Sequence, residues 1–516
     1  MNTNRNTNQT KKYILIALIA LMFVISILFP FVNNSTLATT SYNEKNPSVS
    51  LNMAPPSAAT VIYAKDGEVI GKIYNSQESA YQYMQNPTEQ GQSILYHLIN
   101  VPPYSSNPTI LSIATKLKTY LLKLFKNNNV ISSTDYNQAI NNVGQPYFQV
   151  LHTPYFTEYV IRKLYQKYQK YLLTGGLKVY TTVSPYWNTV AQNIVTQDVA
   201  KYTLPYGASD AALVADNPTN GQIIAMVGGP NYQQNQINMA DVPRHQGSSM
   251  KPLIYIKAFE MGYSPKTMID DAPVCFGSGS NAYCPTDYGG QTKGWMSITQ
   301  AINQSINIPA IKMFNRIGYQ NGLNTLLSEG IKLNTKRYYG LPLILGDTGV
   351  PVVRMVGAYN ALNNGGYYAQ STPFLKIVYN GKTLYNSANV QRKRILQANP
   401  VAEMDTLLGD TAMKQPMYGP ETYYFSIQGR PYGSKDGTTN GPKGITVYEF
   451  IPQVTVGVWA GNANDSLISP NAVGAFETGP FAHSFIMDYI KEKNLPVVNY
   501  PTPVYPQLTS TTATIP

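Results

Sequence analysis

The segment Arg244–Tyr255, "RHQGSSMKPLIY", places two adjacent serines just before a lysine and a proline. Residues three apart on a helix share a face, so a helix that begins near Ser248 brings Ser248 and Lys251 together while Ser249 points elsewhere. Pro252 is tolerated in the first turn of such a helix. A deprotonated lysine beside a serine hydroxyl can take its proton and make the serine a nucleophile. The alternative, from this segment alone, is an N-capping serine with a surface lysine.

Two further motifs follow in the chain. Ser305-Ile306-Asn307 stands in "ITQAINQSINIPAIKMF", and Lys435-Asp436-Gly437-Thr438 stands in "GSKDGTTN". The order Ser-x-x-Lys, Ser-x-Asn and Lys-x-Gly is typical of penicillin-recognising serine enzymes. Longer segments, including "VPRHQGSSMKPLIYIKAFEMGYSPKTMIDDAP" and "GAYNALNNGGYYAQSTP", resemble the transpeptidase domain of class A, or bifunctional-type, penicillin-binding proteins. The resemblance implies an α/β fold, with a central antiparallel sheet flanked by helices and a helical subdomain.

The resemblance also implies the roles of the site residues. Ser248 would be the nucleophile, Lys251 its base and Ser305 a proton relay. Substrate would be held by Asn307, Lys435, Asp436, Gly437 and Thr438, and the backbone N–H groups of Ser248 and Thr438 would form the oxyanion hole. The substrates implied are peptidoglycan stem peptides, with β-lactams as ligands that bind covalently. No cofactor is expected.

Asp436 departs from the family, which usually has threonine or serine there. Side chains alternate along a strand, so positions 436 and 438 face the same side and Lys435 faces the other. A carboxylate at 436 would repel the carboxylate of a substrate or drug. Three outcomes are open: Asp436 pairs with a cation such as Arg244 or Lys443, a local bulge turns it away, or the site takes a different acyl donor.

The amino-terminal region predicts a membrane anchor. Residues 1–12 are polar and basic, and residues 13–32 carry no charge, a length that suits a membrane-spanning helix of about 20 residues. Arg5, Lys11 and Lys12 precede the span, which favours a cytoplasmic tail at 1–12. We therefore expect a single-pass protein of the cell membrane, with a linker at 33–59 and its catalytic domain outside the cytoplasm.

Residues 60–174 are predicted to form a small α/β pedestal. "TVIYAKDGEVIGKIY" indicates two strands around a Lys65-Asp66-Gly67 turn, and "TEYVIRKLYQKYQKYLL" indicates a helix. Class A proteins carry a glycosyltransferase domain here, but its acid motif is missing and the segment is short, so the resemblance implies a truncated domain that polymerises no glycan. A separate glycan polymerase is then an expected partner. The transpeptidase domain is placed at 175–498, with a hairpin at Asn217–Gly221, and a flexible Pro/Thr-rich tail at 499–516.

Composition limits the remaining functions. Cys275 and Cys284 are the two cysteines of the chain and share one loop outside the membrane, where they can close a disulfide or remain as two thiols. The four histidines are scattered, so no metal site is predicted. The net charge of +11 is attributed to a surface that meets anionic lipid or wall polymer, and no nucleic acid partner is expected.

The sequence therefore predicts a membrane-anchored serine D,D-transpeptidase that crosslinks peptidoglycan stem peptides through an acyl-enzyme on Ser248. Two alternatives stay open. One is a deacylating D,D-carboxypeptidase or β-lactamase-like enzyme. The other is a non-catalytic cell-wall scaffold, because Lys-Asp-Gly replaces Lys-Thr-Gly.

Overall fold

The structure is a computed structural model, and it describes residues 60–73, isolated positions between 119 and 137, and residues 148–150, 152–279, 282–439, 441–505 and 514–515. The predicted anchor at 13–32, and with it the cytoplasmic tail and linker, lies outside these ranges. Within them, no helix has the length and apolar character needed to cross a membrane.

The chain divides into two compact units. The first comprises Met1–Val61, Gly71–Gln149 and Tyr165–Lys178, and the second comprises Ile62–Ile70, Val150–Leu164 and Val179–Pro516. The described part of the first unit includes the second half of helix α6 (Pro154–Thr174), which is kinked at Tyr168. This confirms the helix predicted before Gly175. All of the motif residues lie in the second unit.

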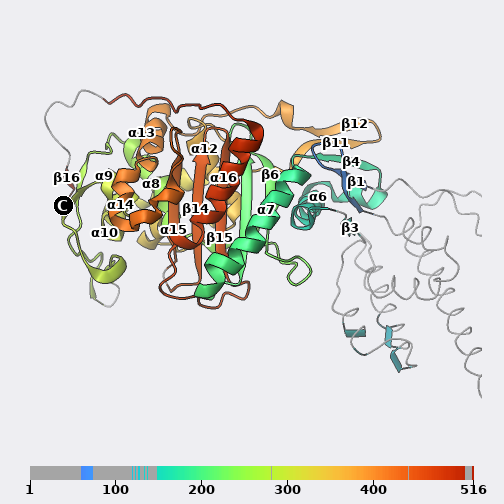
Figure 1. The fold of residues 1–516 in the computed structure, drawn as a ribbon, viewed down its shortest axis with the longest axis horizontal. Helices are drawn as coiled ribbons and strands as arrows, with labels where there is room; N and C mark the ends of the chain where they lie inside the picture. The colour runs from blue at the N-terminus through green and yellow to red at the C-terminus, as the bar shows by residue number, and fades with distance from the viewer. Residues whose placement is uncertain are drawn as a thin grey trace, which may run out of the picture. The chain divides into compact units, whose positions relative to one another are not determined.

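The second unit is built on a five-stranded antiparallel sheet. Its strands, in spatial order, are β13 (Gly433–Thr438), β14 (Gly444–Ile451), β15 (Val454–Gly461), β5 (Asp210–Asn217) and β6 (Gln222–Val227). Every residue of β14 and β15 is buried, because helices cover both faces of the sheet (Figure 1). The strand β13 is at one edge.

Two long helices cover one face of this sheet, and Figure 1 shows both in front of it. They are α7 (Pro185–Asp198) and α16 (Gly479–Lys493). Trp187 of α7 and Phe485 of α16 meet edge to face with ring centroids 5.6 Å apart, inside a core that also takes apolar side chains from β5, β14 and β15. The opposite face packs against α12 (Val352–Asn363). The predicted α/β architecture is confirmed.

A group of helices stands beside the β13 edge and forms the predicted helical subdomain (Figure 1). Its members are α8 (Lys251–Glu260), α9 (Ile298–Asn303), α10 (Asn307–Ile317), α11 (Tyr319–Ser328), α13 (Ala398–Leu408) and α14 (Thr411–Tyr418). The buried helix α8 contacts α10, α11 and α13. The Ser-x-x-Lys motif ends at Lys251, the first residue of α8, and the Ser-x-Asn motif ends at Asn307, the first residue of α10, so this packing brings both motifs to the sheet edge.

Both predicted hairpins are present. The one at Asn217–Gly221 joins the antiparallel strands β5 and β6. In the other, β1 (Thr60–Tyr63) and β2 (Val69–Ile73) are adjacent in a six-stranded sheet of order β12-β11-β4-β1-β2-β3, and Gly67 takes the positive φ that their turn requires. The remaining members of that sheet are β3 (Phe148–Val150), β4 (Leu177–Thr181), β11 (Phe374–Tyr379) and β12 (Lys382–Asn386). The predicted segments 60–174 and 175–498 therefore both contribute strands to one sheet.

The carboxy-terminal segment differs from the flexible tail predicted at 499–516. Tyr500 is held in place, because its hydroxyl donates a 2.8 Å hydrogen bond to Asn363 Oδ1. Thr514–Ile515 forms the short strand β16, which pairs in parallel with β8 (Met268–Asp270). Composition alone missed these contacts because both partners are far away in the sequence.

Candidate active site

The structure separates the two adjacent serines. They lie in the 3-10 helix η4 (Gly247–Met250), where the Lys251 N–H donates to the Ser248 carbonyl. Side chains three residues apart eclipse one another in a 3-10 helix, and Lys251 follows Ser248 by three residues. Ser249 is fully buried, and its hydroxyl donates a 2.6 Å hydrogen bond to the Gln246 carbonyl. Ser248 is the half-exposed serine of the pair.

Lys251 is fully buried and its ammonium nitrogen is held by three oxygens. Nζ lies 2.6 Å from the Ser305 carbonyl, 3.0 Å from the Ile306 carbonyl and 2.9 Å from Asn307 Oδ1. Burial, and after it the charge of Lys435, holds the pKa of Lys251 well below its usual 10.5. This is the direction that a lysine base needs, since only the neutral amine accepts a proton.

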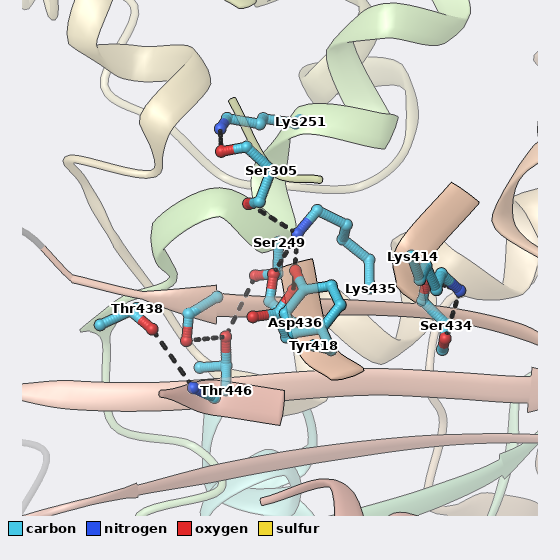
Figure 2. A network of polar contacts seen from close by, with 12 residues as sticks. Ser249, Lys251, Ser305, Lys414, Tyr418, Ser434, Lys435, Asp436, Thr438 and Thr446 are labelled. Atoms are coloured by element: carbon cyan, nitrogen blue, oxygen red, sulfur yellow. Dashed lines mark hydrogen bonds and ion pairs between the residues drawn. The ribbon is translucent and has the colours of Figure 1, made fainter. Parts of the chain in front are cut away.

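Ser305 connects the two lysines of the site, as Figure 2 shows. Its carbonyl faces Lys251, and its hydroxyl oxygen accepts a 2.9 Å hydrogen bond from Lys435 Nζ. Ser305 has φ +57°, a left-handed conformation that costs a residue with a side chain about 1–3 kcal/mol. It occupies the turn between α9 and α10, so the strained backbone is what directs the carbonyl and the hydroxyl to different lysines.

The prediction that Lys435 faces away from Asp436 is wrong. Lys435 Nζ lies 2.8 Å from Asp436 Oδ1 and donates to the Asp436 carbonyl at 2.8 Å as well. Tyr418 donates a second hydrogen bond to Oδ1, at 2.7 Å. Burial acts to raise the pKa of Asp436, but the charge of Lys435 and these hydrogen bonds outweigh it, so the pKa is lowered. Strand alternation fixes the Cβ direction only, and the long lysine side chain curls back to its neighbour.

The cations expected to pair with Asp436 have another partner. Arg244 Nη1 lies 2.7 Å from Asp465 Oδ1, and Lys443 Nζ lies 2.7 Å from Asp465 Oδ2. Neither candidate is the counter-ion of Asp436. Of the three outcomes left open for Asp436, pairing with a cation is the one observed, but the cation is Lys435.

Gly437 lets β13 and η4 approach each other closely. A Cβ at this position would come within 2.3 Å of the Gln246 carbonyl oxygen and 2.9 Å of the Ser249 nitrogen. A Cβ on Gly247 would likewise lie 2.5 Å from the Thr438 carbonyl oxygen. The backbones that carry Ser248 and Thr438, the two expected oxyanion donors, are therefore in contact. Thr438 Oγ1 itself accepts a hydrogen bond from the Gly474 N–H at 3.2 Å (Figure 2).

Asn307 begins α10 and is fixed on both ends of its side chain. Oδ1 accepts from Lys251, while Nδ2 donates a 3.0 Å hydrogen bond to the Thr286 carbonyl. The Asn307 backbone N–H donates to Asp287 Oδ1 at 2.6 Å. Sequence reasoning missed Thr286 and Asp287, since no motif joins them to Asn307, which lies 21 and 20 positions further along the chain.

Two further residues of the site were missed, and both lie on α14. Tyr418 is the hydrogen-bond donor to Asp436 already described. Lys414 is buried behind β13, where its Nζ donates to Ser434 Oγ at 2.6 Å and lies over the ring of Phe425 (Figure 2). Burial, followed by the charge of Lys435, lowers the pKa of Lys414 to about 7. No local pattern distinguishes these side chains from ordinary helix residues.

The cysteine loop precedes Thr286 and Asp287, the two residues that contact Asn307. A disulfide joins Cys275 and Cys284, whose Cα atoms are 4.2 Å apart, which decides between the two states that the sequence left open. The disulfide closes the loop that leads into Thr286 and Asp287. Among the residues that the structure describes, His, Cys, Asp and Glu side chains form no group of three able to hold a metal ion.

Comparisons with known proteins identify a domain of the chain. Residues 211–444 match the model of the penicillin binding protein transpeptidase domain. The chain is 30% identical over 299 residues to penicillin-binding protein 4 of Bacillus subtilis, covering 56% of this chain and 45% of the relative. It is 29% identical over 361 residues to penicillin-binding protein 2D of the same organism, covering 66% and 49%. The chain thus spans about half the length of these relatives.

Solved structures show the same fold. Penicillin-binding protein 1A of Haemophilus influenzae superposes with a TM-score of 0.63 at 18% identity, covering 87% of this chain and 94% of that chain. The PonA1 protein of Mycobacterium tuberculosis in complex with penicillin V gives a TM-score of 0.58 at 20% identity, covering 68% and 96%. These structures share the fold of this chain, and the match over residues 211–444 identifies that part of the chain as a penicillin-binding protein transpeptidase domain, as the three motifs predicted.

Proposed function

We propose that this protein is a serine D,D-transpeptidase that crosslinks the stem peptides of peptidoglycan. The observation that carries the proposal is Lys251, a fully buried lysine of lowered pKa one helical turn after the half-exposed Ser248. Such a lysine is a base suited to activating a serine hydroxyl near neutral pH. An N-capping serine with a surface lysine would have neither the burial nor the contacts with Ser305 and Asn307.

The reaction consists of two acyl transfers. Neutral Lys251 gives up one of its three acceptors, since a neutral amine donates two hydrogens only, and takes the proton of Ser248. Ser248 Oγ attacks the carbonyl of the penultimate D-alanine, an ester forms, and the amide C–N bond breaks. Ser305 gives its hydroxyl proton to the leaving D-alanine, and the proton that Lys251 took from Ser248 restores the Ser305 hydroxyl. An amine of a neighbouring stem then attacks the ester, so that a new amide forms and Ser248 regains its proton.

The other site residues hold charge and substrate in place. The backbone N–H groups of Ser248 and Thr438 serve as the oxyanion hole, where the loss of one donor costs about 2.7–4 kcal/mol in comparable enzymes. Asn307 binds a substrate amide. Lys435 and Thr438 face the terminal carboxylate, although Lys435 shares its charge with Asp436. A β-lactam acylates Ser248 in the same way.

The cellular setting is part of the proposal. The uncharged segment 13–32 anchors the chain in the cell membrane with the transpeptidase domain outside, and a separate polymerase supplies the glycan strands. The Lys435–Asp436 ion pair favours one second candidate, a non-catalytic scaffold that keeps the fold, because the pair neutralises the cation that would attract a substrate carboxylate.

A time course with a fluorescent penicillin tests the proposal. We expect an adduct that persists for hours, together with release of D-alanine from a stem pentapeptide when an amine acceptor is present. An adduct that decays within minutes would identify a deacylating carboxypeptidase or β-lactamase-like enzyme. The absence of any adduct would identify the scaffold and reject the transpeptidase.

A further inference from the structure

A closed loop of the chain reaches from Asp271 to Asp287, and we call it the clamp loop. Its neck is formed by the Cys275–Cys284 disulfide and by a pair of backbone hydrogen bonds of 2.9 and 2.8 Å between Phe276 and Tyr283. The two ends of the clamp loop come back together as a result. Each end carries a buried aspartate, with Asp271 fully buried and Asp287 8% exposed.

The carboxy-terminal end of the clamp loop is hydrogen-bonded to the first residues of α10. Asp287 Oδ1 accepts the N–H of Asn307 at 2.6 Å and the N–H of Ile308 at 3.1 Å. The Thr286 carbonyl accepts Asn307 Nδ2 at 3.0 Å. These three hydrogen bonds fix both the backbone and the amide plane of Asn307. A carboxylate is also favoured at a helix N-terminus by the helix dipole.

Asn307 connects the clamp loop to Lys251, the base of the proposed reaction. Asn307 Oδ1 accepts from Lys251 Nζ at 2.9 Å, and the orientation of that amide is set by its bond to Thr286. The negative charge of Asp287 also acts on Lys251 directly, in the direction that raises the pKa of the amine. Asp287 therefore influences the geometry and the charge of Lys251 without touching Ser248 or a substrate.

The side chain of Asp271 contacts that of Asp287. Asp271 Oδ2 accepts the Lys293 N–H at 2.7 Å, which leaves Asp271 Oδ1 and Asp287 Oδ2 as buried oxygens without a hydrogen-bond donor of their own. Burial, together with a hydrogen bond to Asp287, raises the pKa of Asp271. The two carboxyl groups therefore lie within hydrogen-bonding reach of each other, with Asp271 on the side of Asp287 away from α10.

We propose that Asp287, backed by Asp271 in the disulfide-closed clamp loop, is a positioning residue that sets Asn307 and, through Asn307, the base Lys251. The proposal rests on the proposed function, because it assigns Asp287 a part in the acylation of Ser248. It predicts that acylation depends mainly on an acceptor oxygen at position 287, while the negative charge there makes the smaller contribution.

The test compares variants of the full chain by their rate constant for acylation with a fluorescent penicillin. Asp287→Ala removes the acceptor, whereas Asp287→Asn keeps an oxygen for the two N–H groups. Ser184→Ala is the matched control, because Ser184 caps α7 through the Trp187 N–H but has no contact with the site. We expect the acylation rate constant to fall at least tenfold in Asp287→Ala and to stay within threefold of wild type in Asp287→Asn. In Ser184→Ala it should stay within twofold of wild type, although the melting temperature falls about as much as in Asp287→Ala.

A merely structural role would slow Asp287→Ala no more than Ser184→Ala, and that result overturns the proposal. An Asp287→Asn variant as slow as Asp287→Ala overturns it also. If Asp287→Ala does not fold, Asp271→Ala serves instead, because it keeps Asp287 and removes the side chain that contacts it. That variant is expected to be acylated at least threefold more slowly, and an unchanged rate counts against the proposal.

Amide hydrogen exchange separates this proposal from the proposed function. The amides of Asn307 and Ile308 are expected to exchange at least tenfold faster in Asp287→Ala and to keep their protection in Asp287→Asn. If the wild type takes no penicillin at all, the proposed function fails, and exchange alone decides whether Asp287 positions Asn307. Unchanged exchange at both amides in Asp287→Ala overturns the positioning role.

Discussion

At the scale of single residues, the pair Lys435–Asp436 determines the charge of the site. Lys435 is 2% exposed and makes its ion pair with Asp436 over 2.8 Å. With Lys251 neutral, the two charges cancel, whereas a threonine at position 436 would leave one uncompensated cation. Coulomb attraction between that cation and a carboxylate 4 Å away is about 4 kcal/mol at an effective dielectric of 20. Asp436 therefore weakens the attraction that would draw a β-lactam carboxylate into the site.

We predict that Asp436→Thr speeds acylation by a carboxylate-bearing β-lactam at least several-fold at neutral pH. The variant should also lose about 3 kcal/mol of stability, because a buried ion pair that loses one partner leaves an uncompensated charge. Stopped-flow acylation and urea unfolding measure the two effects. An Asp436→Thr variant that is acylated no faster than wild type would show that Lys435 does not recruit the carboxylate.

The pH dependence of acylation should follow Lys251. Because its pKa is well below 10.5, the wild-type rate should rise with pH and level off well below pH 10.5. The charge of Lys435 lowers the pKa of Lys251, and that of Asp436 raises it. Lys435→Gln should therefore move the midpoint to higher pH, and Asp436→Thr to lower pH. A wild-type midpoint near 10.5, or shifts of the opposite sign, would remove Lys251 as the base.

Asp436 itself should add no step to this profile near neutral pH. Its pKa is lowered from 3.8, so the carboxylate stays ionised throughout the neutral range. An acceleration on acidification, expected if Asp436 were an unpaired repelling carboxylate, is not predicted for this structure.

The motif residues proposed to react or bind substrate could be identified from the sequence. The residues that hydrogen-bond to them and fix their positions could not. Ser248, Lys251, Ser305, Asn307 and Lys435 belong to short motifs with fixed spacing, so their types and order were informative. Tyr418 and Asp287 act over separations of 18 and 20 residues, and nothing local marks them. The Lys435–Asp436 pair was missed because strand alternation says nothing about where a flexible side chain ends.

At the scale of elements, the site depends on how closely β13 approaches η4. Gly437 has no side chain, and the space for one is occupied by the Gln246 carbonyl, the Thr446 hydroxyl and the Ser249 nitrogen. The backbone of η4, which presents Ser248, is thereby set against the strand that presents Lys435 and Thr438. Hairpins such as Asn217–Gly221 were predictable from turn residues, whereas this approach of two distant segments was not.

We predict that Gly437→Ala slows acylation at least tenfold and destabilises the domain by about 1–3 kcal/mol, as overpacking does. The added Cβ would lie 2.3 Å from the Gln246 oxygen, so η4 and Ser248 must shift. Gly479→Ala in the first turn of α16 is the control, since its nearest contact is 3.3 Å. Equal acylation rates in both variants would mean that the close approach is not needed for the reaction.

At the scale of the whole molecule, the chain combines a transpeptidase domain at 211–444 with an amino-terminal region in which no acid motif for sugar transfer was found. The fold class, the transpeptidase domain and the helical subdomain followed from the three motifs and the resemblance that they carry. The placement of the carboxy-terminal strand β16 beside β8 did not, because two-residue strands have no periodicity to detect.

We predict that the purified protein forms no glycan from lipid-linked disaccharide, even under conditions in which it binds penicillin. The reason is the missing acid motif in the short segment before Gly175. Gel analysis of a labelled lipid substrate measures the product, with an added polymerase as the positive control. Glycan chains made by this protein alone would contradict the prediction.

The central claim is that Ser248 forms the acyl-enzyme, and peptide mapping by mass spectrometry after incubation with a penicillin tests it most directly. We predict one adduct per chain, located on Ser248, absent in Ser248→Ala and retained in Ser249→Ala. Ser249→Ala should lose only about 1 kcal/mol of stability, because it removes the 2.6 Å hydrogen bond to Gln246 and leaves Ser248 and Lys251 unchanged in the sequence. An adduct on Ser249, or full labelling of Ser248→Ala, would contradict the account.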